Sequence, residues 1–139
     1  MHFVFLQESP CSEDGTFWKN QWGKEIWLSH GSNRSAGVAI LKDRFNGKVL
    51  EKKIHDKGHW IFLVIEVNAQ FVLLGNIYGY NSDTINCNLL EECEDINSLS
   101  SKYPSAKIIL GGDFNMTWSQ ELDRYPSKPA DRENNLIKF

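Results

Sequence analysis

Residues 60–80, WIFLVIEVNAQFVLLGNIYGY, contain two apolar runs separated by Asn68 and Ala69. Their lengths and their β-branched and aromatic residues predict a β-hairpin, with strands over 60–67 and 71–80. Side chains alternate between the two faces of a strand, and in the first run both faces are apolar. We therefore expect this hairpin to lie inside a layered structure that covers both of its faces.

The second strand of the hairpin changes character along one face. That face begins with Val72 and Leu74 and becomes polar at Asn76, Tyr78 and Tyr80. A strand that begins in the core and ends with polar groups can carry those groups to the edge of a cleft.

The rest of the chain predicts further strands and one long helix. Ser82 and Asp83 are candidate N-cap residues for a helix over 82–102, with an apolar stripe at helical spacing. The stripe consists of Ile85, Leu89, Cys93, Ile96 and Leu99. The other expected elements are strands over 3–7, 25–30, 36–42, 48–55 and 106–110, a polar loop over 9–23 and the start of a helix over 131–139. This order favours an α/β layered sandwich with mixed, mainly antiparallel sheets over a regular βαβ array.

Composition narrows the class of protein. The 139 residues suit one domain, and no internal boundary is evident, so we treat 1–139 as a single, partial domain. No apolar run is long enough to span a membrane, and the first residues do not resemble a signal peptide. Three unpatterned cysteines argue for an intracellular, nuclear or cytoplasmic, protein without a disulfide framework or a zinc site.

The net charge argues against one class of DNA-interacting protein but not against another. The net charge of −3 provides no overall basic field, which argues against a module that only binds DNA. A metal-dependent nuclease is compatible with it, because such an enzyme needs carboxylates and takes positive charge from its ion.

Gly111-Gly112-Asp113-Phe114-Asn115 comes directly after the expected strand over 106–110 and is the first candidate site. Asp113 and Asn115 are two positions apart, so in extended backbone both side chains point to one side. A carboxylate and an amide placed in this way can converge on one phosphate and its attacking water. The alternative is a tight loop in which Asp113 and Asn115 only satisfy local backbone groups.

Glu8 and Tyr78 form the second and third candidate positions. Glu8 comes at the end of a short apolar strand, and a carboxylate at a strand end can hold a hard cation through oxygen. Tyr78 can donate its phenol to a phosphate oxygen. Taken separately, each also fits an exposed acid at a strand terminus and a tyrosine whose hydroxyl reaches water.

Four segments resemble, in order, the endonuclease of LINE-type retrotransposons, a member of the endonuclease/exonuclease/phosphatase (DNase I-like) superfamily. They are Leu6-Gln7-Glu8, the stretch from Ser29-His30-Gly31 through residues 36–41, Asn76-Ile77-Tyr78, and Gly111 to Asn115. Residues 122–126, LDRYP, are also similar to the segment downstream of Asp-Phe-Asn in these elements. Four ordered matches at the spacing of a domain are a stronger signal than the Asp-Phe-Asn tripeptide alone.

The resemblance implies a role for each matching residue. Glu8 matches the glutamate that binds catalytic Mg²⁺ or Mn²⁺, and Asp113 matches the aspartate that orients the attacking water. Asn115 and Tyr78 match residues that contact the scissile phosphate. Asn76 and Asn81 match positions adjacent to the phosphate or substrate. The implied reaction is hydrolysis of a DNA phosphodiester, which nicks one strand to prime reverse transcription by a domain on the same chain in an intact element.

The sequence also departs from that family. Its members carry a metal-proximal asparagine before the Gln-Glu strand, whereas only seven residues precede Glu8 and none is asparagine. They end with an aspartate–histidine pair, but no histidine comes after Asp113 here. Ser9-Pro10 replaces a common Thr-His pair, and Tyr80 replaces a usual proline. We therefore expect a sandwich that is incomplete at both ends and a fragment that is inactive by itself.

The residues leave two alternatives open. The chain fits a relative that hydrolyses another phosphoester, such as abasic DNA or a lipid or inositol phosphate. It also fits a catalytically dead remnant or binding module that keeps the fold without the chemistry.

Overall fold

The computed structural model describes residues 2–8, 15–31 and 37–116, which form two β-sheets and four helices. One sheet has three antiparallel strands in the order β1 (His2–Gln7), β3 (Val38–Asp43) and β2 (Ile26–Ser29). The other has four strands in the order β4 (Lys48–Ile54), β5 (Trp60–Val67), β6 (Gln70–Tyr78) and β7 (Lys107–Asp113). The first three of these are antiparallel, and β7 runs parallel to β6. The expected α/β layered sandwich with mixed sheets is confirmed.

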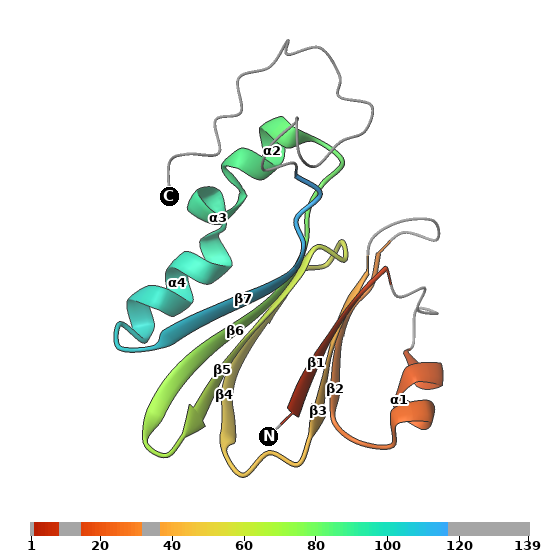
Figure 1. Cartoon of the computed structure of the whole chain (residues 1–139), viewed down its shortest axis with the longest axis vertical. Helices are drawn as coiled ribbons and strands as arrows, with labels where there is room; N and C mark the ends of the chain where they lie inside the picture. Colours follow the sequence, from red (N-terminus) through yellow and green to blue (C-terminus); the bar gives the residue numbers. More distant parts are fainter. Residues whose placement is uncertain (1, 9–14, 32–36, 117–139) are drawn as a thin grey trace, which may run out of the picture.

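The β5–β6 hairpin is the centre of this arrangement. Asn68 and Ala69 connect its strands with φ values of 49° and 60°, the left-handed conformation that two-residue hairpin turns require. One face of the hairpin packs against the three-stranded sheet and the other against helices, as Figure 1 shows. The inner cluster includes Trp27, Val38, Ile40, Ile61, Leu63 and Ile65. The helix-side cluster includes Phe62, Val64, Leu73, Ile77, Leu89, Ile96 and Leu99.

The helix expected over 82–102 is three short helices, α2 (Asp83–Cys87), α3 (Leu89–Glu92) and α4 (Glu94–Lys102). The expectation of one continuous helix was therefore wrong. The breaks fall at Asn88 (φ −106°, ψ 2°) and at Cys93, whose backbone is extended (φ −73°, ψ 102°). Asn86, Cys87 and Asn88 have modest helix propensity, so tertiary contacts decide the path of the chain there.

The predicted apolar stripe holds for all but its first member. Leu89, Cys93, Ile96 and Leu99 are buried against the sheet, and Ser82 caps the first helix through its side chain. Ile85, however, is 52% exposed, and the neighbouring Asn86 is turned inward at 4% exposure. A polar side chain therefore occupies a place where periodicity predicted an apolar one.

The loop expected over 9–23 contains a helix, α1 (Thr16–Trp22), so this expectation was also wrong. The helix lies beside the three-stranded sheet and buries none of its residues fully, which explains why it lacks a clear amphipathic signal. It ends at Gly23, whose φ of 65° is the left-handed conformation typical of a helix C-terminus. The helix expected over 131–139 lies outside the described residues.

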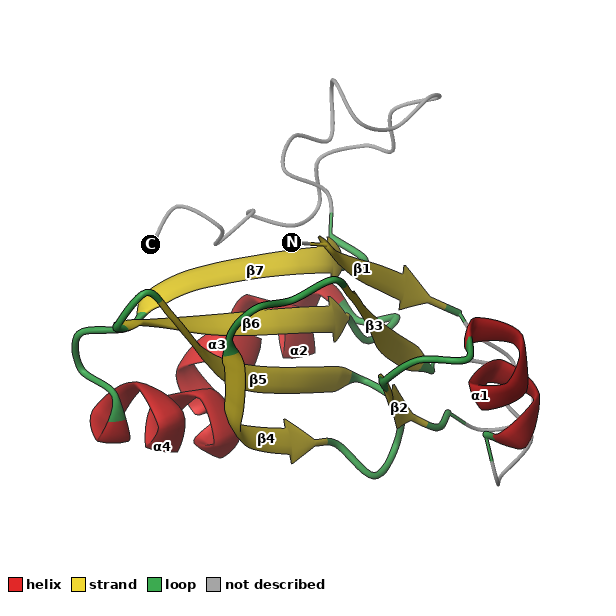
Figure 2. Ribbon diagram, turned by 90° about the horizontal axis from the view of Figure 1, so that it is seen from below, coloured by secondary structure: helices red, strands yellow, loops and turns green. Residues whose placement is uncertain are grey.

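The strand β6 ends at Tyr78, earlier than the sequence suggested, and the alternation of its side chains ends there too. Tyr80 therefore packs with the helix-side cluster and does not join Tyr78 on the inner face. Figure 2 shows β1 and β7 next to each other along one side of the two sheets. In the described part of the chain, no helix has the length and apolar character to cross a membrane.

Candidate functional site

Three strand ends meet at one rim of the sandwich. Tyr78 on β6 and Asp113 on β7 are directly paired because the two strands are parallel and in register. Glu8 comes immediately after the last residue of β1, in the facing sheet. Sheet pairing and sheet packing thus bring together residues that are 35 and 70 positions from Tyr78.

Glu8 and Tyr78 are in direct contact across the two sheets. The Tyr78 hydroxyl donates a hydrogen bond of 2.8 Å to Glu8 Oε1. The phenol ring is buried, at 7% exposure, whereas Glu8 is exposed to solvent. This hydrogen bond raises the pKa of Tyr78 above its usual range; the Asn115 side chain opposes the rise, and burial and the charges of Glu8 and Asp113 add to it. Tyr78 therefore presents a protonated phenol at neutral pH.

Asp113 and Asn115 lie beside this pair and contact one another. The Asn115 backbone N–H donates to Asp113 Oδ1 at 2.9 Å, and Asn115 Nδ2 donates to the Gly79 carbonyl at 2.8 Å. The Gly79 N–H in turn donates to the Asp113 carbonyl at 2.7 Å. The local backbone contacts of the alternative interpretation are thus present. Asp113 nevertheless remains exposed, so its carboxylate is accessible from solvent.

Asn76 lies beneath the rim and not on its surface. It is fully buried at 0% exposure, and its Nδ2 donates to the carbonyls of Leu6 and Ala39, both at 2.9 Å. Its Oδ1 accepts a bond of 2.7 Å from Gln7 Nε2. An amide with no exposed surface has nothing to offer a phosphate directly. Asn76 instead joins the two sheets and fixes the end of the strand that carries Glu8.

The remaining predicted residue is peripheral. Asn81 is exposed on the bend after Tyr80, and it lies outside the hydrogen-bonded cluster formed by the other described residues of the rim. The structure thus brings Glu8, Tyr78, Asp113 and Asn115 together, with Asn76 below them and Asn81 to one side.

His59 belongs to the framework of the rim, although its sequence context indicated no role for it. Its backbone carbonyl accepts from the Tyr78 N–H at 2.7 Å, and its Nδ1 lies 2.8 Å from the Tyr78 carbonyl. A carbonyl oxygen only accepts, so Nδ1 carries the proton. The ring also stacks on Tyr80, with centroids 3.7 Å apart. In the hairpin, Trp60 pairs with Ile77, which places His59 opposite Tyr78. The expected hairpin was therefore the one sequence feature that could have indicated this contact.

The donor set suits a hard, hydrated cation better than a tightly caged one. Among the described residues, no group of three or more His, Cys, Asp and Glu side chains is arranged to hold a metal ion. Glu8 is exposed, and its Oε1 accepts the hydrogen bond from Tyr78. Mg²⁺ commonly binds through one or two carboxylates and retains several waters, so Glu8 fits this mode.

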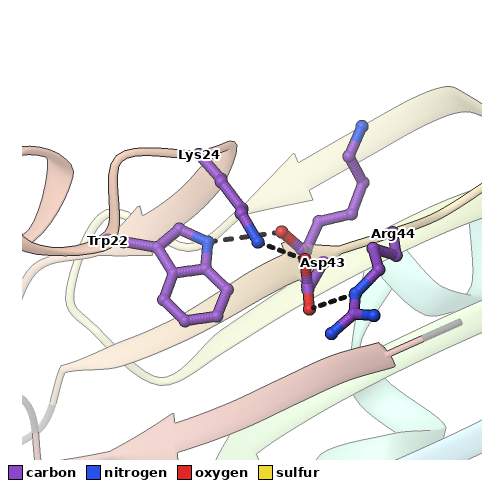
Figure 3. A network of polar contacts seen from close by, with 5 residues as sticks. Trp22, Lys24, Asp43 and Arg44 are labelled. Atoms are coloured by element: carbon purple, nitrogen blue, oxygen red, sulfur yellow. Dashed lines mark hydrogen bonds and ion pairs between the residues drawn. The ribbon is translucent and has the colours of Figure 1, made fainter.

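A second polar cluster lies at the opposite end of the three-stranded sheet, and Figure 3 shows it closely. Asp43 pairs with Lys24 and Arg44, and the Trp22 indole donates to the Lys42 carbonyl at 3.3 Å. The Lys24 hydrogen bond keeps the pKa of Asp43 below its usual range. Both oxygens of the Asp43 carboxylate are paired with cationic side chains, so we assign this cluster a structural role.

Comparison with known proteins identifies the fold. A crystal structure of TDP2 from Caenorhabditis elegans matches with a TM-score of 0.61 and 19% identity, over 89% of this chain and 40% of that one. TDP2 from D. rerio, complexed with a single-strand DNA product, matches at 0.56 and 16% identity, over 83% and 48%. A beta toxin from Staphylococcus aureus matches at 0.57 and 17% identity, over 84% and 54%.

These similarities establish that the chain has the DNase I-like fold. They also show that it spans between 40% and 54% of the length of these three chains. No family model matches the sequence, and no curated protein matches it either.

Proposed function

We propose that this rim is part of the active site of a divalent-metal-dependent phosphodiesterase that cuts DNA. The observation that carries the proposal is the 2.8 Å hydrogen bond between Tyr78 and Glu8, formed across two sheets and next to Asp113. Structural needs alone do not require an exposed carboxylate, a buried phenol and a second exposed carboxylate to share one rim. Hydrolysis of a phosphodiester does need such groups.

Each residue has a distinct part in this proposal. Glu8 holds Mg²⁺ or Mn²⁺, which when bound neutralises charge that develops on the phosphate. Asp113 accepts a hydrogen bond from the attacking water and orients it. Tyr78, protonated at neutral pH, donates to a phosphate oxygen once substrate competes for its hydroxyl. Asn115 contributes its amide to the same phosphate.

The finer identity rests on the ordered sequence resemblance to LINE-type endonucleases. In that setting the enzyme nicks one DNA strand, and a reverse transcriptase domain of the same element extends the new end. The similar D. rerio TDP2 structure holds a single-strand DNA product, which supports DNA as the substrate class for this fold. An abasic-site, lipid or inositol phosphate substrate is the alternative within the same chemistry.

The chain by itself is expected to be a poor catalyst. No histidine comes after Asp113 within these 139 residues, so this chain by itself does not supply the histidine that supports proton transfer in the family. Losing one general acid or base costs about 10²–10⁴-fold in rate. The second candidate is a catalytically dead remnant or binding module of the same fold, which binds DNA without cutting it.

Nicking of supercoiled plasmid in Mg²⁺ distinguishes these functions. We expect negligible nicking by the 139-residue chain and restored nicking by a chimera that supplies the N-terminal strand and C-terminal half of an intact relative. Asp113→Ala should abolish activity of the chimera, whereas Glu94→Ala, an exposed helix substitution, should not change it. Robust EDTA-sensitive nicking by the chain alone would contradict the missing role. A chimera indifferent to Asp113→Ala would contradict the assignment of Asp113.

A further inference from the structure

Asn86 is a buried polar residue in a layer that is otherwise apolar. It lies on α2, is 4% exposed and faces the end of the four-stranded sheet, while the adjacent Ile85 is 52% exposed. Turning an isoleucine to solvent and an amide to the interior costs stability unless the amide is fully hydrogen-bonded. The inward position of Asn86 therefore calls for an explanation in its contacts.

The Asn86 side-chain amide hydrogen-bonds the backbone just after β6. Its Oδ1 accepts from the Tyr80 N–H at 2.7 Å, and its Nδ2 donates to the Tyr80 carbonyl at 2.6 Å. These two bonds imitate the pairing of a further strand. The same Nδ2 also lies 3.4 Å from the carbonyl of Asn115, so one side chain reaches both segments of the rim.

The Asn115 side-chain amide hydrogen-bonds the neighbouring residue, Gly79, in the same segment after β6. Its Nδ2 donates to the Gly79 carbonyl at 2.8 Å, and the Gly79 N–H donates to the Asp113 carbonyl at 2.7 Å. A side chain at Gly79 would collide with the backbone of Phe114, so the two segments approach as closely as backbones can. Residues 79 and 80 are thus held between two asparagine amides.

Asn115 also needs external support for its conformation. Its φ of 49° lies in the left-handed region, which asparagine adopts more readily than other non-glycine residues but which its contacts help to fix here. The contact from Asn86 to the Asn115 carbonyl is one such constraint, and the Asn115 bonds to Asp113 and Gly79 are the others.

We infer that Asn86 is a positioning residue, which holds the Asp113–Asn115 segment against the end of β6 and so sets where Asn115 points. Its importance for phosphodiester chemistry rests on the proposed function. Its action on the geometry of Asn115 does not, and it can be measured without metal or substrate.

Amide hydrogen exchange by NMR on the whole chain tests this inference. In Asn86→Ala, the Gly79 and Asn115 N–H groups, which donate to Asp113, should exchange about tenfold faster or more, as expected when a buried bonding network opens locally. Amides in the middle of the β5–β6 ladder, such as Leu63, should keep their exchange rates.

Two variants serve as controls for Asn86→Ala. Asn97→Ala removes an amide-to-carbonyl bond of 2.8 Å, to Glu91 on the exposed side of the helices, and should leave Gly79 and Asn115 unchanged. Leu99→Ala removes a core side chain at 1% exposure and should accelerate exchange broadly. If the amide exchange rates of Leu63 and Asn115 rose equally in Asn86→Ala, Asn86 would stabilise the whole fold and not this segment in particular. That result would overturn the inference.

A spectroscopic readout at Tyr78 completes the test. Tyr78 is paired with Asp113 at the rim, so displacing the Asp113–Asn115 segment should shift the ¹³Cζ resonance of Tyr78. The shift in Asn86→Ala should have the sign seen in Asn115→Ala, and Asn86→Ala/Asn115→Ala should match Asn115→Ala alone. Additive shifts would contradict action through Asn115. If the exchange and resonance results hold but nicking by the chimera is insensitive to Asn86→Ala, the proposed use of Asn115 is wrong and the positioning inference stands.

Discussion

At the scale of single residues, two of the five described non-glycine residues with left-handed backbones belong to the candidate site. Glu8 and Asn115 both have left-handed backbones, with φ values of 51° and 49°. Each such residue costs on the order of 1–3 kcal/mol and persists only where neighbours impose it. The neighbours here are Tyr78 for Glu8, and Asp113, Gly79 and Asn86 for Asn115. Strain in two of the four clustered residues is a property expected of a site under functional constraint.

The buried amide of Asn76 leads to a stability prediction. Asn76→Ala removes the partner of the buried Ala39 carbonyl and of two half-buried groups, the Leu6 carbonyl and the Gln7 amide. A buried unsatisfied group costs about 1–3 kcal/mol, and a half-buried one less. We expect the free energy of unfolding in urea to fall by about 3 kcal/mol. Asn81→Ala, at an exposed site, should change it by less than about 0.5 kcal/mol. Equal effects would show that Asn76 does not join the sheets.

His55 leads to a prediction about pH. Burial lowers the pKa of its imidazole from the usual 6.5, and the charge of Asp56 opposes this. The folded protein then binds the proton more weakly than the unfolded chain, so the free energy of unfolding falls as pH drops through 6.5 toward the lowered pKa. The His55 ring stacks on Trp60 with centroids 3.8 Å apart, and His55→Phe keeps an aromatic ring there. This variant should weaken the dependence of melting temperature on pH.

The control for His55 is His2→Gln, because His2 is exposed at the start of β1. This variant should keep the slope of melting temperature against pH. A slope that persists in His55→Phe would assign the acid sensitivity to another group.

At the scale of elements, the alternation of side chains correctly predicted the strands and the covered faces of the hairpin. The β5–β6 hairpin and its two covered faces result from alternation over 60–80, and the turn results from Asn68 and Ala69. The main differences between expectation and structure are the helix α1, the breaks at Asn88 and Cys93, and the early end of β6 at Tyr78. There the path depends on packing and on the Asn86 contacts, which no local pattern encodes.

The candidate site could be predicted only in part from the sequence pattern. The parallel register of β6 and β7 and the facing of β1 bring Glu8, Tyr78 and Asp113 together, and neither can be read from spacing. Their grouping was expected from their common placement at strand ends together with the family resemblance. Asn76 was expected adjacent to the phosphate or substrate. Its burial in the interior was not expected, since a sequence does not show which asparagine is buried.

The close approach of β6 and β7 at the rim leads to a prediction for Gly79. A Cβ there would meet the Phe114 backbone, so Gly79→Ala must push the Asp113–Asn115 segment away. We expect a loss of about 1–3 kcal/mol in unfolding free energy, as for other overpacking changes. Gly23→Ala, left-handed at φ 65° but in open space, isolates the backbone cost of about 1 kcal/mol. If both variants lose the same amount, the clash is relieved without cost.

At the scale of the whole molecule, both sheets end on the same side. β1 and β7 are edge strands in their sheets, and they lie next to each other in Figure 2. Among the described residues, three apolar side chains on these edges remain substantially exposed: Val4 at 41%, Ile108 at 51% and Ile109 at 54%. Unpaired edges with apolar side chains favour pairing with another chain. The match to 40–54% of the similar chains agrees with a sandwich whose further strands are absent from the described residues.

We therefore expect the 139-residue chain to self-associate through this side when it is expressed alone. Size-exclusion chromatography with light scattering should show mass that rises with concentration, together with a broad thermal transition. Ile108→Lys/Ile109→Lys places charges on the β7 edge and should reduce association and raise the soluble yield several-fold. Phe17→Lys replaces an equally exposed side chain, at 59%, on α1, away from both edges, and should not. A monodisperse monomer with a sharp, cooperative melt would show that these edges need no further strands. Association that continues in the double lysine variant would place the contact on another surface.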